Sequence, residues 1–146
     1  MSNYDREDPF ANFAFRVEID GIEVFAFTDV SGLSNNTDIY EYQEGGENQY
    51  THKLVGQTTF SNIVLKHGIT TDSEIYEWRQ KVIDGKISSA TKNGTIKLKD
   101  KKTGNEKSWR FYNAWPCKLE VEPLNSSANK IAVSMIELAV ERVEEG

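Results

Sequence analysis

The residues that could carry out chemistry are few. The chain has two histidines, His52 and His67, and one cysteine, Cys117. A nucleophile–base pair needs a histidine beside a serine or cysteine, with a carboxylate to orient it, and no G-x-S-x-G, phosphate-loop or H-E-x-x-H motif occurs. We interpret His67 as a solvated residue at a strand end and Cys117 as a small buried side chain. The expectation is a protein that is not an enzyme.

Metal and cofactor sites are not predicted either. A single cysteine excludes an internal disulfide and every multi-cysteine metal knuckle. Glu41, Glu44 and Glu47 suggest a hard cation, but their spacing matches no EF-hand loop, and Gly45 and Gly46 would point the carboxylates apart. We therefore assign no catalytic, metal-binding or cofactor-binding residue.

Chain length and net charge limit the classes of protein to which the chain can belong. A chain of 146 residues fits one domain of ordinary size. With 23 acidic and 17 basic residues the formal net charge is -6, which argues against a generic nucleic-acid coat. Residues 1–12 lack a basic stretch leading into an apolar one, and no apolar run approaches the length of a membrane span. The expectations are cytoplasmic synthesis without a signal peptide and no membrane insertion.

Alternating apolar residues predict a mainly β domain of about seven strands, arranged as a two-sheet sandwich or barrel. Asp20-Gly21 is a strong signal for a tight hairpin turn after the first strand. In the return strand, apolar residues occupy both odd and even positions, which indicates that both faces of the strand are covered or that a bulge lies near Ala26. The strand regions are 13–19, 22–27, 58–66, 95–99, 109–112 and 117–122.

One helix of about a dozen residues is expected. Thr71–Glu74 form a capping box, and Asp84-Gly85 is typical of a left-handed helix end. Ile75, Trp78 and Val82 share one face. We predict that these three side chains dock the helix on the sheet, with Trp78 as the anchor.

Residues 34–56 are mostly polar and contain glycine, and a connection of this length is more often functional than not. We interpret them as an extended hairpin that turns at Gly45-Gly46, with strands at Ile39–Gln43 and Gln49–Val55. Such an arm cannot bury itself in a small core, so it needs a partner surface.

The spacing of the apolar residues does not decide whether residues 130–143 form a helix or a strand. A stripe from Val133 to Val143 fits a helix, whereas the alternation from Ala132 to Val140 fits a strand. The two interpretations stand side by side on the residues alone.

The order of motifs resembles the tail tube proteins of contractile phages and of phage tail-like, extracellular contractile injection systems. The likeness runs from residue 8 to about 143, so residues 1–8 are expected to be a flexible arm and 9–146 a single tail tube β domain. The motifs that carry it are Phe13–Gly21, Phe27–Leu33, Tyr42–Asn48, His52–Gly56, Ile63–Thr70, a helix with Trp78, Asn113–Pro116 and Ile136–Glu141.

The resemblance implies ring-shaped homohexamers that stack into a hollow inner tube, which conducts DNA or effector cargo without sequence-specific binding. It implies a closing strand at 130–143, a contractile sheath, baseplate or spike and terminator proteins as partners, and a place in a virion tail or in a secreted or cell-anchored injection particle. It also implies that 34–56 is an inter-subunit arm. The residues predicted to carry ring stacking are Tyr40, Glu41, Tyr42, Glu44, Gly45, Gly46, Glu47, Asn48, Tyr50, His52, Lys53 and Leu54.

The sequence also allows a function of a different class. The chain could be a monomeric carbohydrate-binding β-sandwich module that uses the Tyr40–Tyr50 loop and surface tryptophans. Within the tail tube interpretation, the sequence leaves open whether the particle is a phage, a bacteriocin or an extracellular injection system.

Overall fold

The computed structural model describes residues 15–20, 22–46, 50–70, 74–99, 104–122 and 131–146. Several expectations fall wholly or partly outside these residues: the flexible arm at 1–8, the start of the first strand at 13–14, the turn residue Gly21, residues 47–49 of the arm, the helix-capping residues 71–73 and residue 130 of the closing segment.

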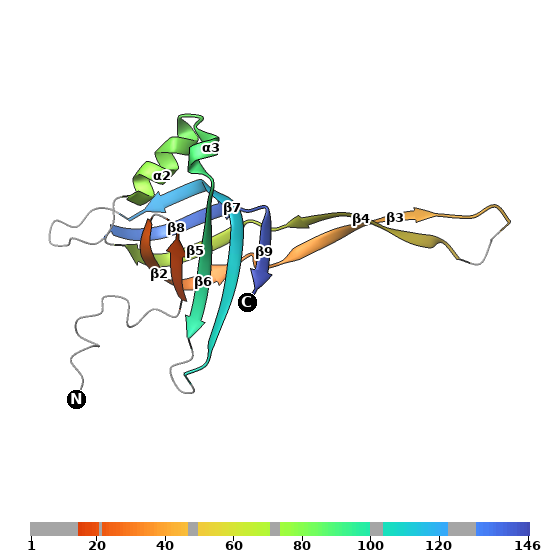
Figure 1. Ribbon diagram of the computed structural model, residues 1–146, viewed down its shortest axis with the longest axis horizontal. Helices are drawn as coiled ribbons and strands as arrows, with labels where there is room; N and C mark the ends of the chain where they lie inside the picture. Colours follow the sequence, from red (N-terminus) through yellow and green to blue (C-terminus); the bar gives the residue numbers. More distant parts are fainter. Residues whose placement is uncertain (1–14, 21, 47–49, 71–73, 100–103, 123–130) are drawn as a thin grey trace.

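A closed antiparallel barrel forms the body of the molecule (Figure 1). Its strands neighbour one another in the order β6, β1, β2, β5, β8, β7, and β7 pairs back with β6. The mainly β class is confirmed, and the barrel is the form observed. The strands are β1 Phe15–Ile19, β2 Ile22–Ser31, β3 Asn35–Tyr42, β4 His52–Phe60, β5 Ile63–Thr70, β6 Lys92–Lys99, β7 Glu106–Val121, β8 Ile131–Ala139 and β9 Arg142–Glu145.

Strand alternation fills the barrel with one apolar core. In β1, Val17 and Ile19 are buried between exposed neighbours. In β2, Phe25 and Phe27 are buried and meet edge to face, with ring centroids 6.5 Å apart. Ala26 between them is buried as well, so both faces of β2 are covered there. A bulge near Ala26 is observed as well: two steps from Val17 to Ile19 in β1 face three steps from Phe25 to Ile22, so the extra residue lies in β2.

The strands expected at 109–112 and 117–122 are one continuous strand, β7. The sequence pattern separates them because β7 carries two bulges, one between Phe111 and Ala114 against β6 and one between Pro116 and Lys118 against β8. Each bulge changes which parity faces inward. β8 and β9 pair with β7 one after the other: Trp115 lies opposite Ala139, and Tyr112 lies opposite Arg142.

The closing segment is β, which confirms the strand implied by the resemblance. Its apparent helical period has a physical cause. Val133, Ile136 and Leu138 are all buried, although 133 and 136 differ in parity, because the β7–β8 register shifts at Glu120/Val121. A second irregularity separates β8 from β9. Because the buried side chains switch between odd and even positions twice in this segment, its apolar residues recur every three or four positions, as they would on a helix.

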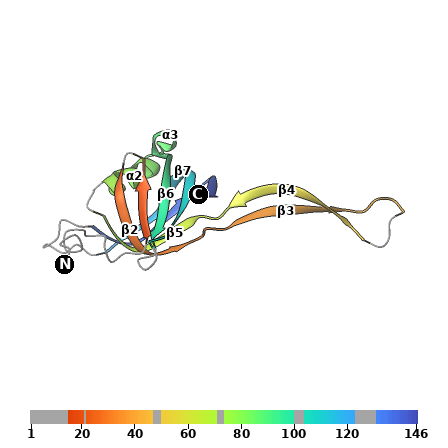
Figure 2. The same cartoon turned by 60° about the horizontal axis from the view of Figure 1, so that its bottom comes forward.

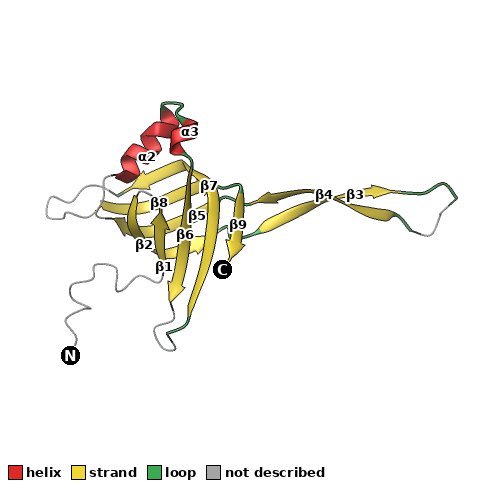
Figure 3. Ribbon diagram, viewed as in Figure 1, coloured by secondary structure: helices red, strands yellow, loops and turns green. Residues whose placement is uncertain are grey.

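The expected helix is α2, Glu74–Ile83 (Figure 3). Ile75 and Trp78 are buried, and Val82 packs partly buried against the core. The chain leaves the helix through Gly85, whose φ is +79°. No sequence pattern indicated the short helix α3, Ile87–Ala90, which receives a hydrogen bond from the indole Nε1 of Trp78 to the carbonyl of Ala90.

Candidate functional site: the projecting arm and its root

Strands β3 and β4 form a two-stranded hairpin that extends away from the barrel (Figure 2). Every residue of β3 is exposed. The hairpin is longer at its base than the strands expected at Ile39–Gln43 and Gln49–Val55, since pairing continues to Asn35 opposite Phe60. Residues 58–60, which the sequence assigned to the third strand region, belong to the arm because the chain leaves its strand at residues 61–62.

The first face of the arm is aromatic. Tyr42 lies opposite His52 in the register, and the two rings stack with centroids 5.1 Å apart. Tyr50 meets His52 edge-on at 5.3 Å, and Tyr40 lies opposite Leu54. We call Tyr40, Tyr42, Tyr50, His52 and Leu54 the aromatic face.

The second face is aliphatic and also carries one acidic and one basic side chain. Ile39 lies opposite Val55, and Glu41 lies opposite Lys53. Ile39 is 60% exposed and Val55 is 85% exposed. We call these four residues the aliphatic face.

Both faces of the arm are therefore uncovered. An isolated two-stranded hairpin is marginally stable in water, and a contiguous exposed apolar surface marks an interaction site. The Nε2 atom of His52 is buried by its neighbours yet has no hydrogen-bond partner among the described residues. In addition, each strand is paired on one side only, which leaves backbone groups on both outer edges.

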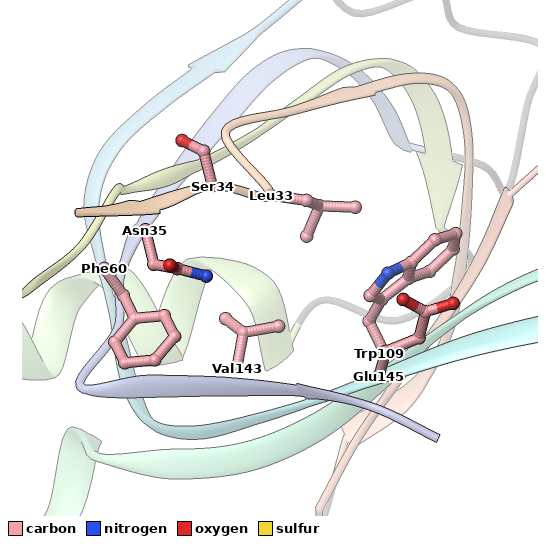
Figure 4. A pocket seen from close by; sticks show the side chains of 7 residues that line it. All are labelled: Leu33, Ser34, Asn35, Phe60, Trp109, Val143 and Glu145. Atoms are coloured by element: carbon pink, nitrogen blue, oxygen red, sulfur yellow. The ribbon is translucent and has the colours of Figure 1, made fainter. Parts of the chain in front are cut away.

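A pocket of about 120 Å³ opens at the root of the arm (Figure 4). It lies between the start of β3, the end of β4 and strands β7 and β9. Sequence reasoning missed this pocket, because four separate segments build it and no motif marks them. Its lining residues are Leu33, Ser34, Asn35, Phe60, Trp109, Val143 and Glu145.

The structure places the residues predicted to carry ring stacking in one projecting element. Those in the strands are Tyr40, Glu41, Tyr42, His52, Lys53 and Leu54; Glu44, Gly45 and Gly46 lie in the exposed connection, and Tyr50 precedes β4. Gly46 has a φ of +89°, which suits a turn. Glu47 and Asn48 lie outside the described residues. The role of the set in contacts between subunits stays a prediction.

The residues considered for chemistry are scattered. His67 is exposed with a φ of +55°, within β5 rather than in a turn. Cys117 is half-buried, and its Sγ lies 3.7 Å from a carboxylate oxygen of Glu137. Burial and the Glu137 carboxylate raise the pKa of the Cys117 thiol. In the described part of the chain, no group of three or more His, Cys, Asp or Glu side chains is placed to hold a metal ion.

None of the helices in the described ranges is long and apolar enough to cross a bilayer. No curated protein matches the chain.

The arrangement is similar to that of several solved structures. One is a chain of the sheath–tube complex of an extracellular contractile injection system, PVC, in the extended state, with 28% identity, coverage of 100% of this chain and 98% of that chain, and a TM-score of 0.65. A chain from the baseplate of the anti-feeding prophage has 22% identity, coverage of 100% and 97%, and a TM-score of 0.67. Hcp1 from Flavobacterium johnsoniae has 15% identity, coverage of 92% and 95%, and a TM-score of 0.54. The last two likenesses concern the fold alone.

The family model described as T4-like virus tail tube protein gp19 matches residues 11–144, and the chain therefore belongs to this tail tube family.

Proposed function

We propose that this chain forms hexameric rings that stack into a hollow tube, with the arm holding one ring to the next. Membership of the tail tube family makes the chain a structural subunit of the inner tube of a contractile injection system. The observation that carries the ring-stacking proposal is the arm itself. It presents apolar residues on two opposite faces, and copies of the same chain would cover them.

The tube would work with a contractile sheath around it, a baseplate or spike at one end and a terminator at the other. In support, similar chains occur in structures described as a sheath–tube complex and as a baseplate. The lumen would conduct DNA or effector cargo without sequence-specific binding, and the subunit would act without catalysis. We place its synthesis in the cytoplasm, without a signal peptide, and its final position in a virion tail or an extracellular particle.

The monomeric carbohydrate-binding module has no support from the family match or from the similar structures.

The test is assembly of the purified protein. Negative-stain microscopy is expected to show rings and tubes, and deletion of residues 41–50 is expected to leave folded subunits that do not elongate. Long tubes from the deletion variant would contradict the role of the arm. A strictly monomeric wild-type protein at all concentrations would contradict the tube proposal as a whole.

A further inference from the structure

We propose that the pocket at the root of the arm, the root pocket, receives the aliphatic face of the arm of a second copy of this chain. The inference rests on the proposed ring stacking and names the surface on which the arm docks. The residues that meet are Val55 with the pocket interior and Lys53 with Glu145.

The root pocket is lined by both polar and apolar side chains. Leu33, Phe60 and Val143 line it together with the ring of Trp109 (Figure 4). A cavity of about 150 Å³ is large enough for benzene, so a pocket of about 120 Å³ has room for one aliphatic side chain. An open pocket of this kind gains free energy when an apolar side chain displaces its water.

The polar groups of the pocket have unused hydrogen-bonding capacity. Figure 4 shows the indole nitrogen of Trp109 on the side of the ring that faces Leu33 and Val143. Neither this nitrogen nor the side-chain amide of Asn35 has a hydrogen-bond partner among the residues that the structure describes. The outer edges of an arm carry free backbone carbonyl and N–H groups, which are suitable partners for both.

The charge at the pocket favours the aliphatic face. Val143 and Glu145 are two residues apart in β9 and both line the pocket. Glu145 has no ion pair with any described residue. Two residues before Val55, on the same face of β4, stands Lys53, which likewise forms no ion pair within the described ranges. The aliphatic face thus offers an apolar side chain and a cation two residues apart, which is also the separation of Val143 and Glu145 in β9.

The aromatic face does not fit in the same way. Its largest side chains already pack on one another, since Tyr42 stacks on His52 and Tyr50 meets the edge of that ring. It carries no lysine or arginine among its five defining residues.

A chain cannot fill its own root pocket. Phe60 lies at the pocket, and Val55 stands five residues further out along β4. At about 3.3 Å per residue the valine lies roughly 16 Å from the root, and the hairpin leads away from the barrel (Figure 2). An arm that fills this pocket must therefore come from another copy.

The first experiment is a disulfide test between copies, in a Cys117→Ser background. One preparation carries Val55→Cys, a second carries Val143→Cys, and the two are mixed under assembly conditions and oxidised. Because each copy holds one cysteine, a covalent heterodimer reports an intermolecular contact. The matched control replaces Val143→Cys with Val121→Cys, at a valine 39% exposed in β7. We expect a heterodimer yield at least about tenfold above this control.

The second experiment reverses the charges and guards against a variant that misfolds. Lys53→Glu and Glu145→Lys are each expected to shorten tubes several-fold, and the double variant is expected to restore their length. Lys53→Glu also places a second acid opposite Glu41, and this repulsion could disturb the arm by itself. Restoration of tube length by Glu145→Lys would show that the loss comes from the contact between copies and not from that repulsion. The control is Lys118→Glu, which breaks an exposed ion pair with Glu120.

The outcomes separate the two proposals. Normal tubes with equal crosslinking at positions 143 and 121, or without rescue in the double variant, would overturn the root-pocket contact and leave the tube proposal standing. Absence of rings and tubes from the wild-type protein would overturn the proposed function itself.

Discussion

The ring of Tyr40 lies directly over Gly56 on the neighbouring strand of the arm. A Cβ atom at position 56 would be 2.6 Å from Cε2 of Tyr40 and 2.8 Å from the carbonyl oxygen of Asp38. The backbone oxygen cannot move away as a side chain can. The absence of a side chain at Gly56 therefore fixes how this aromatic ring lies on the arm.

Gly56→Ala is expected to distort the arm without unfolding the barrel. The melting temperature should change by less than a few degrees, because the arm contributes no residue to the core, whereas tube length in negative stain should fall several-fold. Gly146→Ala, outside the arm, is the matched control, since a Cβ atom added at position 146 would meet only Oγ of Ser108 at 3.9 Å, an ordinary van der Waals contact. Equal tube lengths for both variants would contradict the importance of the Tyr40–Gly56 contact.

Trp78→Phe is expected to reduce the free energy of unfolding by about 2 kcal/mol. The substitution removes the donor to the carbonyl of Ala90, and an unsatisfied buried acceptor costs about 1–3 kcal/mol. Urea denaturation followed by circular dichroism measures the loss. Tyr76→Phe on the exposed side of the same helix should change stability by less than about 0.5 kcal/mol. Similar losses for both variants would mean that the indole hydrogen bond does not hold α3 against α2.

Asn113 in β7 is hydrogen-bonded both to β6 and to the connection between β8 and β9. Its φ is +53°, its N–H donates to Oδ1 of Asn93 at 2.9 Å, and its Nδ2 donates to Oε2 of Glu141 at 2.6 Å. Asn113→Ala should cost about 2 kcal/mol, since a non-glycine residue in the left-handed region costs about 1–2 kcal/mol and a side-chain hydrogen bond is lost as well.

Asn113→Gly separates these two causes. It loses the same side-chain hydrogen bond but adopts a positive φ readily, so its expected cost is about 1 kcal/mol. Urea denaturation of the two variants in parallel checks the difference. An equal cost for alanine and glycine would show that backbone conformation contributes nothing at this bulge.

Cys117 is expected to react slowly with iodoacetamide at pH 7–8. Burial and the carboxylate of Glu137 raise the pKa of the thiol, and only the thiolate is nucleophilic. Glu137→Gln removes the negative charge, lowers the pKa and should accelerate alkylation, with the rate rising at a lower pH than in the wild-type protein. Glu144→Gln, whose carboxylate accepts a hydrogen bond from Tyr112 instead, should leave the rate unchanged. A slower reaction for Glu137→Gln would contradict the electrostatic cause.

Much of the fold follows from local patterns. Alternation predicted β1 and β6, and the face of Ile75 and Trp78 with the ending at Gly85 predicted α2. The family interpretation rested on the order of short motifs and is confirmed by the match over residues 11–144. These features depend on neighbours in the sequence, so one chain is enough to see them.

Other features depend on pairings between distant residues. The bulge at Pro116–Lys118 hid the continuity of β7, and the parity changes in β8 imitated a helix. The root pocket combines residues from 33 to 145, and register decides which of them meet. A local period carries no information about register between strands that are far apart.

The two halves of the root-pocket contact are made at different times. Ribosomes make β3 and β4 well before β9, to which Val143 and Glu145 belong. The barrel also closes late, because Phe15 in β1 must wait for Leu98 in β6. The arm of a nascent chain is thus made before the root pocket of the same polypeptide is complete. Under the proposed root-pocket contact, the order of translation would let an arm be received only by subunits whose β9 has already been made.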